Sequence, residues 1–174
     1  MTANEFSRPV RLDTIGSQPR AMRIEADEAE RKALARRFSL TALDRLEAEL
    51  NVHSAGDDVV AEGRMRAELV QACVATGAPV PARIEEPFVL RFRPEGTPEE
   101  GFEVELDAEE LDTIFYEGSA VDVGEAVAQT LALALDPFPR ADGAADALRE
   151  AGVKDEDEAG PFGALAGLKD KLKG

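Results

Sequence analysis

The chain has 174 residues, 44% of them hydrophobic and 32% charged, a composition typical of a folded protein that buries a core without disulfides or metals. Its formal net charge of -16 repels nucleic acids and anionic membranes on average. No apolar stretch approaches the roughly 20 residues of a membrane-spanning helix. The N-terminal MTANEFSRPVRLD lacks a signal-peptide run and a single cysteine excludes an internal disulfide, so we expect a cytoplasmic protein.

The first predicted element is a short helix that begins after Asp27 and ends near Arg37. Asp27 followed three residues later by Glu30 is a capping-box signature, in which side chain and backbone at the helix start bond to each other. Leu34 and Phe38 supply its apolar contact. We expect this helix to cover one end of a sheet.

A long hairpin is predicted next. Apolar and polar residues alternate strictly at 46–52 and again at 61–69, as half-buried strands require. Residues 54–57, Ser-Ala-Gly-Asp, have the composition of a turn between them.

Further strands are predicted downstream of the hairpin. Residues 80–92 alternate in the same way, with an expected change of register at Glu85-Glu86-Pro87, where the proline indicates a bulge or a sheet edge. Two shorter strands are predicted around residues 102–106 and 114–116.

A second helix carries the stronger helical signal. Asp122 with Glu125 repeats the cap signature, and apolar residues then recur at i, i+3, i+4 and i+7 up to Leu135. Its far side is also apolar, which predicts burial around most of its circumference. Pro137 and Pro139 end it.

Beyond Arg140 the composition of Ala, Gly, Asp and Glu predicts a segment without a fixed conformation, including an acidic run at 155–158. The closing PFGALAGLKDKLKG places apolar residues on one helical face with lysines nearby, so this segment can order against a partner. These residues are Leu165, Leu168 and Leu172 with Lys169, Lys171 and Lys173.

The pattern as a whole predicts an α+β fold. We expect one domain at 1–140, an antiparallel twisted sheet or partly open barrel packed by two helices. Residues 141–174 would follow it as an acidic linker and short amphipathic tail, flexible and acidic overall.

Reactive side chains are scarce. The one histidine, His53, stands beside the hairpin turn, so no Ser-His-Asp, Cys-His or multi-histidine site can be assembled. For Cys73 we favour a small buried hydrophobe over a nucleophile. The sequence contains no GxGxxG, GxxxxGK[ST] or CxxC motif. We therefore expect no catalysis, no cofactor and no metal.

Four arginines form the one arrangement that suggests binding. Arg64 and Arg66 share the polar face of one strand, and Arg91 with Arg93 shares the face opposite Phe92 on another, which would align guanidinium groups for phosphate contacts. The alternative is a salt-bridged, solvated face, which we favour. The acids that would pair are Glu62, Glu68 and Glu85. No aromatic residue accompanies these arginines, so base stacking of the usual single-strand type is not expected.

Several motifs, in order, resemble those of one family. QACVATGAPV at 71–80 resembles the central motif of the YceD-like family of large ribosomal RNA subunit accumulation proteins, and VDVGE at 121–125 with LALDPFPR at 133–140 resembles its second block. The closing PFGALAGLK is similar to the tail of alphaproteobacterial members. The matching positions are Gln71, Cys73, Thr76, Pro79, Asp122, Pro137 and Pro139.

The resemblance implies a bacterial cytoplasmic protein needed for normal accumulation of large-subunit ribosomal RNA, an assembly or processing helper without catalysis. Its partners would be precursor ribosomal RNA or ribosome-assembly proteins, with no membrane and no DNA. Thr76 stands where many relatives have a second cysteine, and no cysteine follows near Arg140 as in some relatives. One thiol cannot hold zinc, so the resemblance implies no metal site here.

The sequence thus favours binding, through the arginine face or the lysine-bearing tail, over chemistry. Two alternatives stay open: a protein-protein adaptor without RNA contact, and a small hydrolase acting through Cys73.

Overall fold

The structure is a computed structural model that describes residues 4–96 and 112–153. The chain divides into two compact units. One comprises Met1–Gln71 and Pro81–Pro137, and the other comprises Ala72–Val80 and Phe138–Gly174. The expected strand at 102–106 and the amphipathic tail lie outside the described residues.

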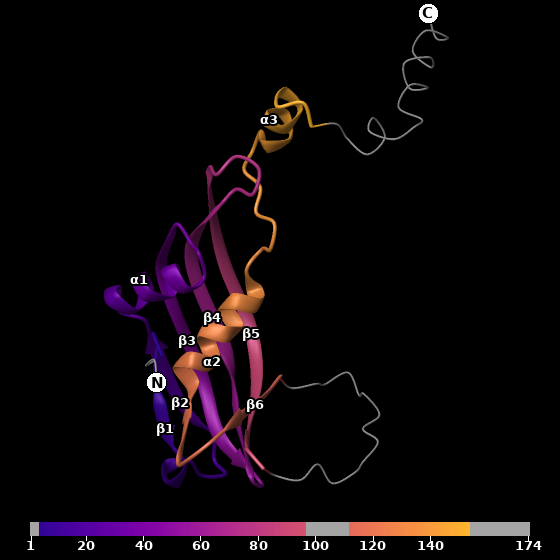
Figure 1. The fold of residues 1–174 in the computed structure, drawn as a ribbon. Helices are drawn as coiled ribbons and strands as arrows, with labels where there is room; N and C mark the ends of the chain where they lie inside the picture. The colour runs from indigo at the N-terminus through magenta and orange to yellow at the C-terminus, as the bar shows by residue number, and fades with distance from the viewer. Residues whose placement is uncertain (1–3, 97–111, 154–174) are drawn as a thin grey trace, which may run out of the picture. The chain divides into compact units, whose positions relative to one another are not determined.

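A five-stranded open sheet dominates the first unit (Figure 1). In spatial order its strands are β2 (Arg20–Glu25), β3 (Ala42–Ala55), β4 (Asp58–Ala72), β5 (Pro79–Pro94) and β6 (Asp112–Tyr116). The expected, mostly antiparallel sheet is confirmed, and it is open rather than closed into a barrel. β6 differs from the expectation because it runs parallel to β5. A parallel neighbour needs a long connection, which residues 95–111 provide.

The predicted hairpin is formed by β3 and β4. Leu50 lies opposite Gly63, and Leu46 lies opposite Ala67, so the two apolar series meet on one face as their alternation requires. Gly56 makes the turn with a positive φ of 66°. A bulge at Leu43/Arg45 shifts the register near the start of β3.

β5 is one continuous strand, so the expected change of register at Glu85-Glu86-Pro87 is wrong. Its apolar residues keep even numbers on both sides of Pro87, and Phe88, Leu90 and Phe92 are buried. The expected sheet edge is present instead. β6 pairs only with the second half of β5, Leu90–Pro94. In the first half, Pro79, Pro81 and Pro87 all stand at odd-numbered positions, so their nitrogens point to the same side of the strand.

Both predicted helices are present. α1 (Glu28–Arg37) has the complete capping box of Asp27 and Glu30, and it packs against β3. α2 (Val123–Ala134) begins at Asp122, whose carboxylate accepts hydrogen bonds from the N–H groups of the first turn. Glu125 does not complete the second box, because its carboxylate binds Arg37 at 2.7 Å instead.

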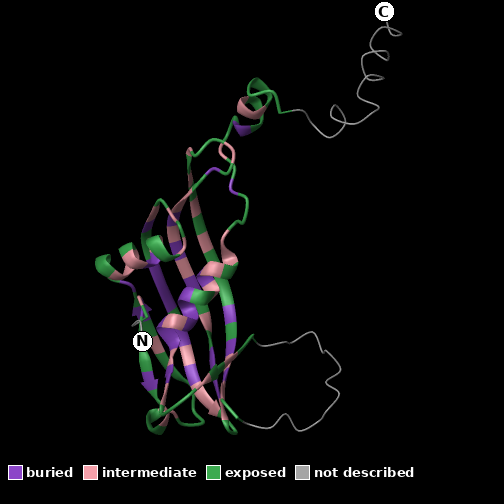
Figure 2. Cartoon of the chain, in the orientation of Figure 1, coloured by how far each residue is buried: buried purple, intermediate pink, exposed green. Residues whose placement is uncertain are grey.

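The core lies between α2 and one face of the sheet. In Figure 2 the buried residues, in purple, alternate along β3 and β4 and recur along α2. Leu131 and Val127 of α2 join Leu46, Met65 and Phe92 in this core. The expected burial around most of α2 is confirmed, since of its residues only Gln129 and Leu133 are exposed, Leu133 by 80%.

The N-terminal segment completes the first unit. β1 (Pro9–Arg11) pairs antiparallel with β7 (Ala120–Asp122), and a 3-10 turn, η1 (Leu12–Thr14), follows β1. Val10 of β1 and Val121 of β7 are buried and belong to the same hydrophobic core.

A third helix, α3 (Ala144–Glu150), lies in the second unit, where we expected no fixed conformation after Arg140. Its sequence, AADALRE, consists mostly of strong helix formers, and Ala144 is buried. The expectation was wrong for this segment because overall composition hid a short run with high helix propensity.

Candidate nucleic-acid interface

The face of the sheet opposite α2, which we call the outer face, carries equal numbers of arginines and acids at its alternating positions. The arginines are Arg23, Arg45, Arg64, Arg66, Arg83, Arg91 and Arg93. The acids are Glu25, Glu47, Glu49, Asp58, Glu62, Glu68 and Glu85. The outer face is therefore balanced in charge, within a chain whose net charge is -16.

The structure gathers Arg64 and Arg66 around one acid. Their guanidinium groups lie 3.3 and 3.4 Å from the carboxylate of Glu85 on the neighbouring strand. The ion-paired arrangement that we favoured from the sequence is thus present for this pair, and Arg66 also lies 3.7 and 3.8 Å from the carboxylates of Glu47 and Glu49 on β3.

Glu47 forms a second cluster, which sequence reasoning missed. It points to the outer face as its alternation requires, yet it is only 2% exposed. Arg45 and Arg23 lie 2.7 and 2.8 Å from its carboxylate, and Arg66 lies at 3.7 Å. Hydrogen bonds donated first by Arg45 and then by Arg23 lower the pKa of Glu47, against the opposing effect of burial. The arginine side chains that pair with Glu47 therefore also shield it from solvent.

Arg91 and Arg93 are held by a different acid, Asp58, at the start of β4. Arg93 donates two hydrogen bonds to its carboxylate, at 3.0 and 3.2 Å. Arg91 approaches the same carboxylate only to 3.7 Å, and its buried Nε has no hydrogen-bond partner among the residues described. Both guanidinium groups approach the carboxylate of Asp58, as those of Arg64 and Arg66 approach the carboxylate of Glu85.

An exposed aromatic ring stands beside this second pair. Phe115 of β6 lies opposite Arg93 of β5 and is 58% exposed. The expectation that no aromatic residue accompanies the arginines is therefore wrong. Along the chain the two residues are far apart, and only the parallel pairing of β5 with β6 brings them together.

The two blocks of family-like motifs meet in the structure. The side-chain amide of Gln71 donates to the carbonyl of Asp136 at 2.9 Å, and the N–H of Val74 donates to the carbonyl of Pro139 at 2.9 Å. Between β4 and β5 the chain turns tightly, with the N–H of Cys73 donating to the carbonyl of Ala78 at 2.8 Å. Pro79 begins β5.

The thiol of Cys73 is 3% exposed, as expected for a buried cysteine, but it lies outside the apolar core cluster. Its surroundings are hydrogen-bond donors. The hydroxyl of Thr76 and the backbone N–H of Ala141 lower the pKa of the Cys73 thiol to about 7, against burial. Within residues 4–96 and 112–153 no three histidine, cysteine or acidic side chains gather as metal ligands would.

Asp122 has a structural part in the second motif block. Its carboxylate accepts hydrogen bonds from both the N-terminal segment and α2, namely from Asn4, Ser7, Arg8, Gly124 and Glu125. Burial raises the pKa of Asp122, but these bonds, first that from the Arg8 N–H, outweigh it and lower the pKa.

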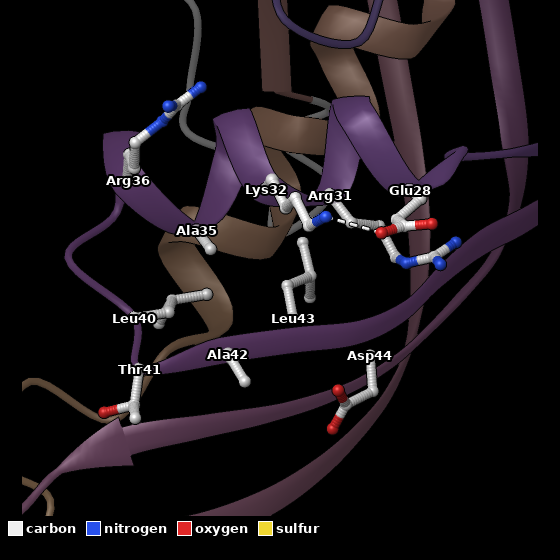
Figure 3. Close-up of a pocket in the computed structure, with 10 residues that line it drawn as sticks. All are labelled: Glu28, Arg31, Lys32, Ala35, Arg36, Leu40, Thr41, Ala42, Leu43 and Asp44. Carbon is white, nitrogen blue, oxygen red and sulfur yellow. Dashed lines mark hydrogen bonds and ion pairs between the residues drawn. The ribbon is translucent and has the colours of Figure 1, made fainter.

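A groove of about 580 Å³ separates α1 from the start of β3 (Figure 3). Ala35, Leu40 and Leu43 lie between the helix and the strand, while Lys32 and Glu28 are paired with each other at its rim. The residues that line this groove include no histidine or cysteine. The groove therefore offers an apolar floor but neither an imidazole nor a thiol.

These features define an α+β protein with an open sheet, an ion-paired arginine surface and a cysteine-bearing turn joined to a proline motif. The chain belongs to the YceD family: the model of that family, described as large ribosomal RNA subunit accumulation protein YceD, matches residues 61–169. A role in large-subunit ribosomal RNA accumulation follows, and this description names no catalytic activity. The alphaproteobacterial character of the tail stays a prediction.

No curated protein and no solved structure matches the chain. Among the helices in the described ranges, none is long and apolar enough to cross a membrane.

Proposed function

We propose that the protein acts in the cytoplasm as a non-catalytic factor and supports large-subunit ribosomal RNA accumulation by binding RNA through its outer face. The observation that carries this proposal is the pair Arg91 and Arg93, which both contact the carboxylate of Asp58 beside an exposed aromatic ring. Elsewhere the excess of acids, which gives the chain its charge of -16, opposes contact with a polyanion.

The ion pairs of the outer face are compatible with this function. A guanidinium carries five N–H donors, more than one carboxylate accepts, so a phosphate oxygen can bind beside the carboxylate without displacing it. Arg91 and Arg93 keep 38% and 32% of their side-chain surface exposed. Planar guanidinium groups suit phosphate because they donate two parallel hydrogen bonds.

The test is a double variant, Arg91→Gln with Arg93→Gln, in cells that lack the native protein. We expect large-subunit ribosomal RNA to fall toward the level of cells without the protein, and RNA affinity in vitro to weaken at least about tenfold, because each lost charge-assisted bond contributes about 1.5–3 kcal/mol. Arg36→Gln, on α1, removes one arginine charge away from the outer face and should leave both unchanged.

If the double variant folds and fully restores ribosomal RNA levels, Arg91 and Arg93 are not the contact, and the function depends on Arg64 and Arg66 or on another surface. Circular dichroism and thermal unfolding of the variants separate loss of contact from loss of fold.

A protein-protein adaptor is the second candidate, favoured by exposed apolar side chains at the motif blocks. Val74 is 55% exposed and Phe138 is 72% exposed, so these two side chains offer apolar area that an assembly protein could cover. Substituting both with serine should abolish co-purification with an assembly protein if the adaptor is correct. The same variant should bind RNA normally if the outer face carries the function.

The hydrolase alternative depends on Cys73, and the only histidine of the chain is His53 of β3. Cys73→Ala tests it directly: normal ribosomal RNA levels in cells carrying this variant would remove support for it.

A further inference from the structure

We infer that Phe115, flanked by Arg91 and Arg93, is a stacking site for one unpaired base of single-stranded RNA. This inference rests on the proposed function and adds the class of RNA, namely single-stranded rather than duplex.

The site is built by the parallel pairing of β5 with β6. Arg93 lies opposite Phe115, and Arg91 lies opposite Thr113, so the guanidinium groups and the ring project from neighbouring positions of one face. Neighbouring strands are about 4.8 Å apart, which places them within reach of one nucleotide. Phe115 is exposed, whereas its neighbours Ile114 and Tyr116 pack against the core.

The exposed ring of Phe115 and the adjacent guanidinium groups of Arg91 and Arg93 favour an unpaired base over a paired one. A phenyl ring on an open sheet stacks with the flat face of any base, and such stacking tolerates every sequence. In a duplex that face is already covered by the adjacent base pairs, so a paired base cannot reach the ring. The phosphate beside the stacked base would then bind a guanidinium group.

Charge fixes the direction in which the RNA leaves the ring. Beyond the ends of β5 and β6 stand Glu95 and Glu117, and a hydrogen bond between them raises the pKa of Glu95. Phosphates on that side would be repelled. We therefore place the phosphate on the side of Arg91, whose guanidinium makes the looser contact with Asp58.

A tryptophan reporter tests the stacking directly. The chain contains no tryptophan, so Phe115→Trp introduces a single one at the site. We expect a single-stranded oligoadenylate to quench its fluorescence with saturation, and a fully paired duplex of the same length to leave it unchanged. Leu133→Trp, on exposed α2 surface, is the matched control and should not be quenched by either.

Two further substitutions separate stacking from general apolar contact. Phe115→Tyr keeps the ring and should bind the single strand as the native chain does, whereas Phe115→Leu keeps apolar area without the ring. Loss of one base stack weakens binding by about 5-fold to 150-fold, and we expect Phe115→Leu to fall in this range.

The outcomes distinguish this inference from the proposed function. If the native chain binds RNA and Arg91→Gln weakens it, but Phe115→Leu binds normally and Phe115→Trp is not quenched, stacking is wrong and RNA contact stands. Equal affinity for duplex and single strand would also overturn it. If the native chain binds no RNA at all, the proposed RNA contact fails and the inference fails with it.

Discussion

The pKa of the Cys73 thiol is set by the turn in which it lies, and no histidine is needed to lower it. Its thiol accepts hydrogen bonds from the Thr76 hydroxyl and from backbone N–H groups, including that of Ala141. Each of these bonds favours the thiolate over the thiol. Thr76, which departs from the family pattern by replacing a cysteine, therefore still supports Cys73, as a donor instead of a second thiol.

Thr76→Val should raise the pKa of Cys73 from about 7 toward the ordinary thiol value of 9.0, because it removes the hydroxyl donor. Ultraviolet absorbance of the thiolate during a pH titration measures this directly. Thr76→Ser, which retains the hydroxyl, is the control. Identical titration curves for the native chain and Thr76→Val would show that the hydroxyl does not hold the thiolate.

The same lowered pKa makes stability depend on pH. Because the folded chain binds the Cys73 proton less tightly than the unfolded chain, its contribution to stability is complete above a pH of about 9 and is lost as the pH falls through about 7. Cys73→Ser lacks this contribution. The difference in unfolding free energy between the native chain and Cys73→Ser should therefore increase from pH 7 to pH 9.

Glu47 marks the limit of reasoning from alternation at this scale. Alternation along β3 correctly predicts that it points away from the core. Its burial depends on Arg23 of β2 and Arg66 of β4, which only strand pairing brings to it. A polar residue can thus be assigned a face from the sequence, while its exposure cannot.

At the scale of elements, the start of α2 is the joint that holds the N-terminal segment. Gly124 lies so close to that segment that a Cβ atom would stand 2.5 Å from the carbonyl oxygen of Phe6 and 2.9 Å from the nitrogen of Arg8. Real side chains do not approach backbone this closely. The glycine of the VDVGE motif is therefore required by packing.

Gly124→Ala should destabilise the fold by about 1–3 kcal/mol, because the backbone at Phe6 and Arg8 must shift to admit the methyl group. This loss opposes the gain of about 1 kcal/mol that alanine normally brings to a helix. Urea unfolding measures the net effect. Gln129→Ala, at an exposed position of the same helix, is the control and should be neutral or slightly stabilising; a Gly124→Ala chain more stable than native would contradict the close contact.

Helices and the hairpin could be predicted from the sequence because their signals are local. The Asp27 and Asp122 caps and the two-residue alternation of β3 and β4 each lie within a few residues of the element that they specify. The parallel placement of β6 could not, since it pairs residues 22 positions apart in the sequence, such as Arg93 and Phe115. Arg91 and Arg93 of the candidate site were named from the sequence, but Phe115 was missed for the same reason.

At the scale of the whole molecule, the distribution of charge matters more than its sum. The net charge is -16, yet the outer face holds as many arginines as acids. RNA that approaches must therefore be attracted locally and repelled elsewhere. The chain should bind RNA weakly unless the contacts at the outer face are specific.

Salt separates this mode of binding from docking of the apolar tail. The logarithm of RNA affinity should fall linearly with the logarithm of salt concentration, with a slope of about -0.7 for each phosphate contacted in a single strand. Arg91→Gln should make this slope shallower. Binding that is indifferent to salt would favour instead a contact through Leu165, Leu168 and Leu172, whose burial is driven by water rather than by charge.

The prolines of β5 restrict the ways in which anything can join this protein. Pro81 and Pro87 present no N–H along a border of the sheet, and an added peptide strand needs an unbroken row of such donors. Addition of a β-strand from another protein, or from a second copy of this chain, is therefore disfavoured at that edge. A partner must therefore bind through side chains on the faces of the sheet, so single substitutions on those faces can change which partner is bound.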